Sequence, residues 1–189
     1  MSKKIDGICF KNMVDYAVRN LNKNVKVVNQ LNVFPVPDGD TGTNMVTTIH
    51  KGLKAVGESI VDLPSVSRKF ARSVVFEARG NSGVIVSQLF RGLAKGLKGC
   101  EEINAITFAT AMENGVETAY KAVMKPKEGT ILTVAKAAAA KCLEAALQSD
   151  DLIDVFAQAI ESGEEIPLYG NNDTLDLPKN LFIIGTSRE

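Results

Sequence analysis

Histidine is nearly absent from this sequence: His50 is the only one among 189 residues. It falls inside a stretch whose apolar residues recur at helical spacing, and no partner for proton transfer stands beside it. Nucleophilic catalysis by serine, histidine and aspartate needs such a partner. The sequence therefore disfavours that chemistry and predicts a structural role for His50.

Cysteine is also scarce, with three residues far apart in the chain: Cys9, Cys100 and Cys142. Their number is odd and their spacing is not that of a metal site, which disfavours both a disulfide framework and a zinc centre. We expect buried, reduced thiols, as in a cytoplasmic protein.

The chain carries no net charge, because 22 Lys and Arg balance 22 Asp and Glu. No net positive field therefore favours nucleic acid or an anionic membrane as a partner. No apolar run is long enough to span a bilayer, and the first residues, MSKKIDG, do not resemble a signal peptide. Since 45% of the residues are apolar, we expect one domain with a substantial core.

Apolar residues recur at helical spacing through most of the chain. The predicted helices cover residues 6–21 and 43–59, 64 to about 78, 82 to 97, 104–124, 131–147, and 150 or 151 to 163. Residues 25–31 fit either a helix or a strand, and 181–184 form a short β-like run. The expected N-caps are Thr41 or Thr43, Ser65, Asn81 or Ser82, Thr130, and Asp150 or Asp151. Helices joined by short loops predict an all-α, antiparallel up-and-down bundle.

The most distinctive stretch is LNVFPVPDGDTGTN, at residues 31–44. Its prolines fix φ and remove amide donors, and Gly39 and Gly42 allow positive φ. Asp38 and Asp40 stand just before a helix start, where carboxylates could bind Mg²⁺ while helix amides face a phosphate. The same PDG sequence is also typical of an ordinary turn. A calcium EF-hand is excluded, because Thr43 stands at the position that requires glycine.

Two further helix-start loops share this chemistry: GNSG at residues 80–83 and EGT at residues 128–130. Each could be only a capped helix start. In an up-and-down bundle, however, loops two elements apart meet at the same end. The pattern therefore predicts that all three loops converge on a nucleotide phosphate chain with Mg²⁺.

Residues 32–45, NVFPVPDGDTGTNM, resemble the signature of the DhaL-type nucleotide-binding domain, named for the L subunit of dihydroxyacetone kinase. RGNSGVI at 79–85 and EGTILTV at 128–134 resemble its other two blocks. With GVETAYKAVM at 115–124, the similarity is greatest to the N-terminal domain of the ATP-binding A subunit of fatty acid kinase. The resemblance covers roughly residues 5–163. We expect a DhaL-like domain over residues 1–163 and a divergent tail, loop or partly disordered, over residues 164–189.

The resemblance implies a barrel-like helical bundle that binds ATP or ADP at one end, with Mg²⁺ between carboxylates and phosphates. It implies metal ligation by Asp38 and Asp40, with Asn32 near the position of a third acidic ligand. The nucleotide contacts that it implies are Thr41, Gly42, Thr43, Asn44, Asn81, Ser82, Gly129 and Thr130. No residue is assigned as a catalytic base.

In fatty acid kinases, a separate DegV-type fatty-acid-binding protein presents the lipid carboxylate, and the product is an acyl phosphate. The resemblance implies this partner and allows a homodimer of the full-length subunit. The PVPD form at residues 35–38 favours this branch. The alternatives are a nucleotide-binding module for regulation or assembly, and a nucleotide subunit of the dihydroxyacetone (glycerone) kinase type.

The sequence also departs from the family pattern. Glu77 stands where glycine is common, and Lys127 stands where an apolar residue is common. We find no closing Asp-x-Gly-Gly turn and no final helix after Gly163. We therefore expect this stretch alone to bind nucleotide weakly and to lack independent catalysis.

Overall fold

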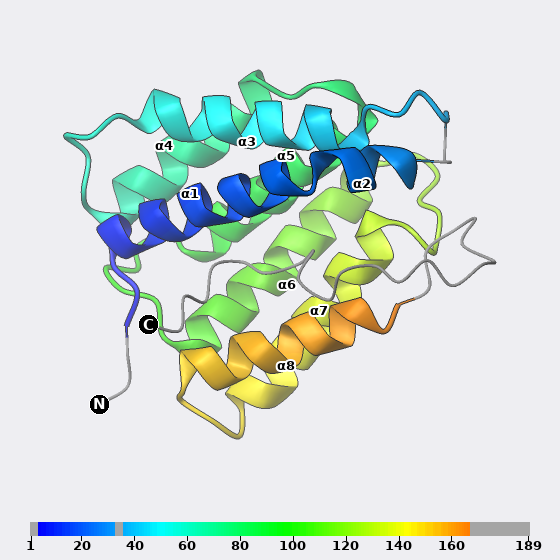
Figure 1. Ribbon diagram of the computed structural model, residues 1–189. Coiled ribbons are helices and arrows are strands. Elements are labelled where there is room, and N and C mark those ends of the chain that lie inside the picture. The colour runs from blue at the N-terminus through cyan, green and yellow to red at the C-terminus, as the bar shows by residue number, and fades with distance from the viewer. Residues whose placement is uncertain (1–3, 33–35, 167–189) are drawn as a thin grey trace.

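The computed structural model describes residues 4–32 and 36–166 (Figure 1). Its regular elements there are eight helices: α1 (Gly7–Lys23), α2 (Val25–Gln30), α3 (Thr41–Val56), α4 (Leu63–Phe76), α5 (Gly80–Gly96), α6 (Ala105–Ala122), α7 (Ile131–Ala146) and α8 (Leu152–Glu164). The all-α prediction is confirmed, and residues 25–30 of the ambiguous stretch 25–31 are helical. The β-like run at 181–184 and most of the predicted tail lie outside the described residues.

The helices form two groups that meet along α5 and α6. In one group α3, α4 and α5 pack against one another, and α1 lies across α3 and α4. In the other, α7 packs between α6 and α8. Figure 1 shows α1–α4 in the upper half of the molecule and α6–α8 in the lower half. None of the described helices is long and apolar enough to cross a membrane.

Glycines bring α5 and α6 into close contact. A Cβ on Gly92 would lie 2.2 Å from the Asn114 carbonyl oxygen and 2.6 Å from the Cα of Gly115. A Cβ on Gly96 would lie 2.7 Å from the Cα of Ala111. As α5 advances from Gly92 to Gly96, its neighbours therefore step backwards along α6. The two helices are antiparallel, so the end of α6 lies toward the start of α5.

Aromatic pairs mark the core on both sides of this contact. Phe70 lies edge-to-face with Phe10, with ring centroids 6.2 Å apart, and with Phe90, at 4.9 Å. Phe108 and Phe156 form a similar pair at 4.6 Å between α6 and α8. This geometry is favoured by the ring quadrupoles and adds to the burial of apolar area.

Several helix starts match the predicted caps, and others do not. Thr130 caps α7 with a capping box, and Asp151 caps α8. The prediction of Ser65 is wrong, because Asp62 caps α4 by accepting from the Ser65 amide. The caps expected for α5 are also wrong: that helix begins at Gly80, so Asn81 and Ser82 lie within its first turn.

The single histidine and the three cysteines differ in how deeply they are buried. His50 is exposed on α3 and lies outside the core. Cys142 is buried and Cys100 is half-buried, but Cys9 is exposed, so the expectation of buried thiols is wrong for Cys9.

Candidate functional site

The first turn of α3 is capped by a side chain from α2. The Asn29 Oδ1 accepts from the backbone amides of Gly42 at 2.7 Å and Thr43 at 3.2 Å, and its Nδ2 donates to Thr43 Oγ1 at 3.0 Å. Asp40 occupies the N-cap position without making a side-chain cap. The predicted caps, Thr41 and Thr43, are therefore wrong.

Gly42 makes this contact between α2 and α3 possible. A Cβ there would lie 2.9 Å from the Val25 carbonyl oxygen and 3.0 Å from Asn29 Oδ1. Gly39 uses the conformational freedom of glycine, with φ of 68°, whereas Gly42 is helical and does not. The glycine at position 42 is needed for close approach rather than for a turn.

The acidic loop is held by a hydrogen bond across its own ends. Asn32 Nδ2 donates to Asp38 Oδ1 at 2.6 Å. Asp38 is exposed and Asp40 is half-buried at the start of α3. Both carboxylates therefore lie just before the first turn of α3, and the Asn32 side chain holds that of Asp38.

The second predicted loop packs directly on the first. Gly80 has φ of 58°, and a Cβ there would lie 2.2 Å from Asn44 Nδ2. Ser82 Oγ donates to the Thr41 carbonyl oxygen at 3.3 Å. The structure thus brings the predicted contacts Thr41, Asn44 and Ser82 together, as the loop alternation predicted.

The same face of α3 continues into the loop before α5. Thr48 is buried, and its Oγ1 accepts from the Arg79 backbone amide at 3.0 Å. A Cβ on Gly83 would lie 2.5 Å from that oxygen. Glu77, one of the departures from the family pattern, pairs with Lys51 of α3 at 3.4 Å. These contacts fix the start of α5 against α3.

The third loop emerges at the same end of the molecule. Because α5 and α6 are antiparallel, the loop that follows α6 emerges at the end of the molecule where α5 begins, as Figure 1 also shows. Thr130 Oγ1 donates to the Lys127 carbonyl oxygen and accepts from the Leu132 amide. Glu128 accepts from Thr133 Oγ1 at 2.8 Å and from the Tyr120 hydroxyl at 3.4 Å. Burial, and then the Glu128 charge, raise the pKa of Tyr120.

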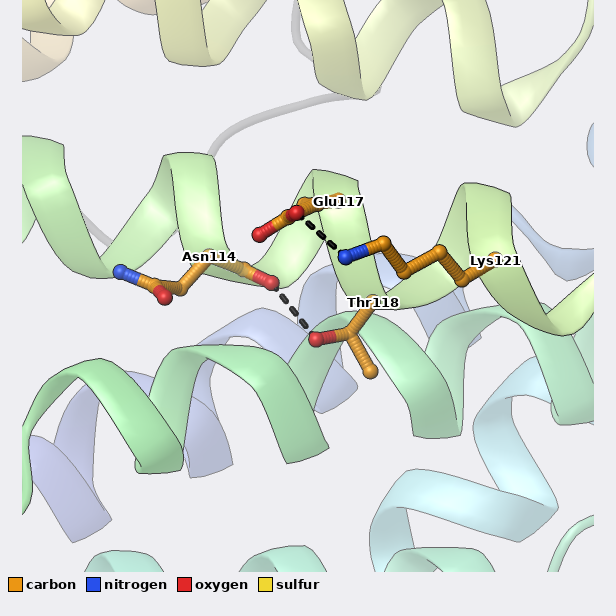
Figure 2. A network of polar contacts seen from close by, with 4 residues as sticks. All are labelled: Asn114, Glu117, Thr118 and Lys121. Carbon is orange, nitrogen blue, oxygen red and sulfur yellow. Dashed lines mark hydrogen bonds and ion pairs between the residues drawn. The ribbon is translucent and has the colours of Figure 1, made fainter.

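An open groove of about 730 Å³ lies elsewhere, between α6 and α7. Its lining includes Asn114, Glu117 and Lys121 but none of the predicted site residues. Figure 2 shows that Lys121 and Glu117 form an ion pair along α6 and that Thr118 Oγ1 donates to the Asn114 carbonyl oxygen. The Lys121 hydrogen bond lowers the pKa of Glu117. Both interactions stay within one helix, so we assign them a structural role.

The donor set of the acidic loop fits Mg²⁺ bound together with phosphate. In the described part of the chain, no three His, Cys, Asp or Glu residues are grouped as a metal cage. Mg²⁺ usually takes one or two carboxylates and completes its shell with water and phosphate oxygens. Asp38 and Asp40 supply such a pair, and Asn32, whose amide nitrogen is bonded to Asp38, orients that carboxylate.

Two residues of this cluster were not found from the sequence, Asn29 and Thr48. Both act between helices, and neither belongs to a glycine-rich or acidic motif. No local sequence signal singled out either residue.

Comparison with known proteins assigns the family. The DAK2 domain model matches residues 35–167, more than half of the chain, so the chain belongs to the DAK2 domain family. DhaL-type domains bind ADP or ATP in general and occur in kinase subunits, so membership of the family supports a nucleotide-binding, kinase-related role for this domain.

The chain is also similar to uncharacterized staphylococcal proteins. It is 47% identical to one from Staphylococcus saprophyticus over 97% of this chain and 33% of the relative. It is 47% identical to one from Staphylococcus epidermidis over 87% of this chain and 30% of the relative. It is 46% identical to one from Staphylococcus aureus USA300 over 88% of this chain and 31% of the relative. The chain thus spans about a third of the length of these relatives.

Proposed function

We propose that this chain is the ATP- and Mg²⁺-binding domain of a kinase that phosphorylates fatty acids. In this proposal a separate DegV-type fatty-acid-binding protein presents the acceptor carboxylate, and the product is an acyl phosphate. The observation that carries the proposal is the packing of the acidic loop and the first turn of α3 on the first turn of α5. That contact gathers two carboxylates and the polar side chains of two helix starts at one end of the bundle.

The residues of the site would divide the work between metal and nucleotide. Asp38 and Asp40 would hold Mg²⁺, which neutralises charge on the phosphates when bound. Thr41, Asn44, Asn81 and Ser82 would contact the nucleotide from α3 and α5, and Gly129 and Thr130 would do so from the third loop.

The structure bears on how Gly42 and Thr43 could take part. Their amides already donate to Asn29. A phosphate at this turn would therefore use other donors, such as the Thr43 hydroxyl, or would displace Asn29.

The proposed reaction needs no general base. A carboxylate oxygen of the fatty acid attacks the γ-phosphorus, the bond from that phosphorus to the bridging oxygen breaks, and ADP leaves with the electron pair. The acceptor is already ionised near neutral pH, so no proton is transferred. Phosphoryl transfer of this kind depends mainly on positioning and charge neutralisation. That demand suits a site built from carboxylates, amides and hydroxyls.

The test is an assay of the purified chain with Mg²⁺-ATP and a long-chain fatty acid, with and without a DegV-type partner, followed for ADP and acyl phosphate. We expect acyl phosphate only with the partner, because the partner holds the lipid. Acyl phosphate in equal amount without the partner would contradict the two-component proposal. Saturable nucleotide binding with no transfer to any presented fatty acid would favour a regulatory module, and transfer to dihydroxyacetone would favour the glycerone kinase alternative.

A further inference from the structure

Asn29 occupies hydrogen-bonding positions that normally belong to the N-cap residue. An Asp at an N-cap usually accepts from the second or third amide of its own helix. In α3 those amides belong to Gly42 and Thr43, and the Asn29 oxygen accepts from both. Asp40, at the N-cap, makes no such bond. The carboxylate of Asp40 is therefore not used to cap the helix.

The contact between Asn29 and the start of α3 depends on a glycine at position 42. Gly42 has no Cβ, and any Cβ there would press on the Val25 carbonyl oxygen at 2.9 Å and on Asn29 Oδ1 at 3.0 Å. The Asn29 Nδ2 is also engaged, since it donates to Thr43 Oγ1. Both ends of the Asn29 carboxamide are thus committed to α3.

We propose that Asn29 is a positioning residue that caps α3 in place of Asp40 and so keeps the Asp40 carboxylate available for the metal. Asn32 acts differently on Asp38, because it donates directly to that carboxylate at 2.6 Å and so orients it. Asn29 caps the helix without adding a third negative charge beside the two carboxylates. This assignment rests on the proposed function of the acidic loop.

Removal of Asn29 has a specific consequence. In Asn29→Ala the amides of Gly42 and Thr43 lose their acceptor, and the Asp40 carboxylate can turn onto them as an ordinary cap. Capping by Asp40 would limit the loss of stability but would withdraw a metal ligand. Residues that orient the ligands of a metal commonly change its affinity by about 10- to 100-fold. We expect a loss in that range for metal and for Mg²⁺-nucleotide.

The test compares wild type with Asn29→Ala, Asn29→Asp and a control, Asn104→Ala. Asn104 caps α6 by accepting from the Thr107 amide at 2.9 Å, and α6 begins at the end of the bundle opposite the site. The control thus loses the same kind of bond far from the loop. Binding of Mn²⁺ alone and of Mg²⁺-ATP is titrated, and thermal unfolding is followed for each variant. Mn²⁺ serves as a probe because it shares the oxygen preference of Mg²⁺.

We expect Asn29→Ala to bind Mn²⁺ at least about tenfold more weakly while unfolding no earlier than Asn104→Ala. Asn29→Asp keeps the acceptor for the two amides, so Asp40 stays free, and its added negative charge beside the two carboxylates should let it bind Mn²⁺ at least as tightly as wild type. Wild-type Mn²⁺ binding in Asn29→Ala, or an equal loss in Asn104→Ala, would overturn the positioning role. If wild type binds Mn²⁺ but no nucleotide, the proposed function fails and the Mn²⁺ series still decides the role of Asn29. If wild type binds neither, both are overturned.

Discussion

Asp38 and Asp40 are two residues apart and yet have different surroundings. Asp38 is exposed and accepts a hydrogen bond from Asn32, whereas Asp40 begins α3 and is half-buried. We expect Asp38→Asn and Asp40→Asn to weaken Mg²⁺-nucleotide binding, because each removes a charge that the metal needs. Neither side chain packs in the core, so unfolding free energies should change by about 0.5 kcal/mol or less. Calorimetric titration with Mg²⁺-ATP and denaturant unfolding measure the two effects. Wild-type binding in both variants would leave the acidic loop as a turn only.

Ser82 has a different role from the helix cap that its sequence position suggests. Its hydroxyl donates to the Thr41 carbonyl oxygen at 3.3 Å and so joins α5 to α3. We expect Ser82→Ala to lose about 1 kcal/mol of stability, as for a typical internal hydrogen bond. If Ser82 also contacts phosphate, nucleotide affinity should fall at temperatures where the variant is fully folded. Ser87→Ala is the control, since the Ser87 hydroxyl bonds within α5 to the Val84 carbonyl oxygen. Unchanged affinity in folded Ser82→Ala would leave only the structural role.

At the scale of helices, the glycine contact between α5 and α6 sets which loops share an end. A Cβ at Gly92 would lie 2.2 Å from the Asn114 carbonyl oxygen, which is backbone and cannot rotate away. We expect Gly92→Ala to destabilise the protein by about 1–3 kcal/mol through overpacking. Gly163→Ala in α8 is the control, because its Cβ would meet Val134 Cγ1 at 3.4 Å. At position 163 the higher helix propensity of alanine should raise the free energy of unfolding by at most about 1 kcal/mol. Equal effects of the two substitutions in urea unfolding would contradict the close packing.

The helices were predictable from the sequence because periodicity of apolar residues reports directly on a buried helix face. Residues 6–21 and 104–124, for example, match α1 and α6 to within two residues at each end. The six residues of α2 carried no such signal. Six residues cover less than two turns, and their helical state depends on packing against α3.

The candidate site was predictable only in part. Alternation of helices was enough to bring the acidic loop and residues 80–83 to one end, and the structure shows them in contact. The cap of α3 was not predictable, because local rules assume that a helix start is capped from its own chain neighbours. It comes from Asn29, 13 residues before Gly42, and such a contact depends on tertiary packing, which a single sequence does not show. The Asp62 cap of α4 is an ordinary local one, three residues before Ser65, and the prediction of Ser65 overlooked it.

At the scale of the whole molecule, the two ends of α3 carry opposite chemistry. Its first turn lies beside Asp38 and Asp40. The loop after its last turn receives the Lys11 ammonium, which donates to the carbonyl oxygens of Gly57 and Ile60 at 3.0 and 3.1 Å. Lys69 donates to the Val56 carbonyl oxygen at 3.1 Å. Cations at a helix C-terminus and anions at its N-terminus both agree with the helix dipole. Lysine side chains therefore bind the carbonyl oxygens at the C-terminal end of α3, and the polar groups of the candidate site lie at its N-terminal end.

Stability of the whole fold should fall at alkaline pH because of Cys142, a fully buried thiol in α7. Burial raises the pKa of Cys142 from 9.0 to about 12. In the unfolded chain the thiol loses its proton near its ordinary pKa, while the folded protein keeps that proton until about pH 12. Between those values the unfolded state binds fewer protons, so unfolding becomes more favourable as pH rises. One proton corresponds to a slope of at most about 1.4 kcal/mol per pH unit.

The pH dependence is measured by urea unfolding from pH 8 to pH 10.5 for wild type, Cys142→Ala and Cys9→Ala. We expect the Cys142→Ala curve to be the shallower, because the unfolded chain then lacks the thiol whose ionisation favours it. Comparison of slopes rather than absolute stabilities removes the constant cost of the cavity that the alanine leaves. Cys9 is exposed, and the partial burial of its thiol, and then the Asp6 charge, raise its pKa. Cys9→Ala should therefore keep most of the wild-type slope. Parallel curves for wild type and Cys142→Ala would show that this thiol ionises alike in both states, and the burial of α7 against the rest of the bundle would then be looser than its packing implies.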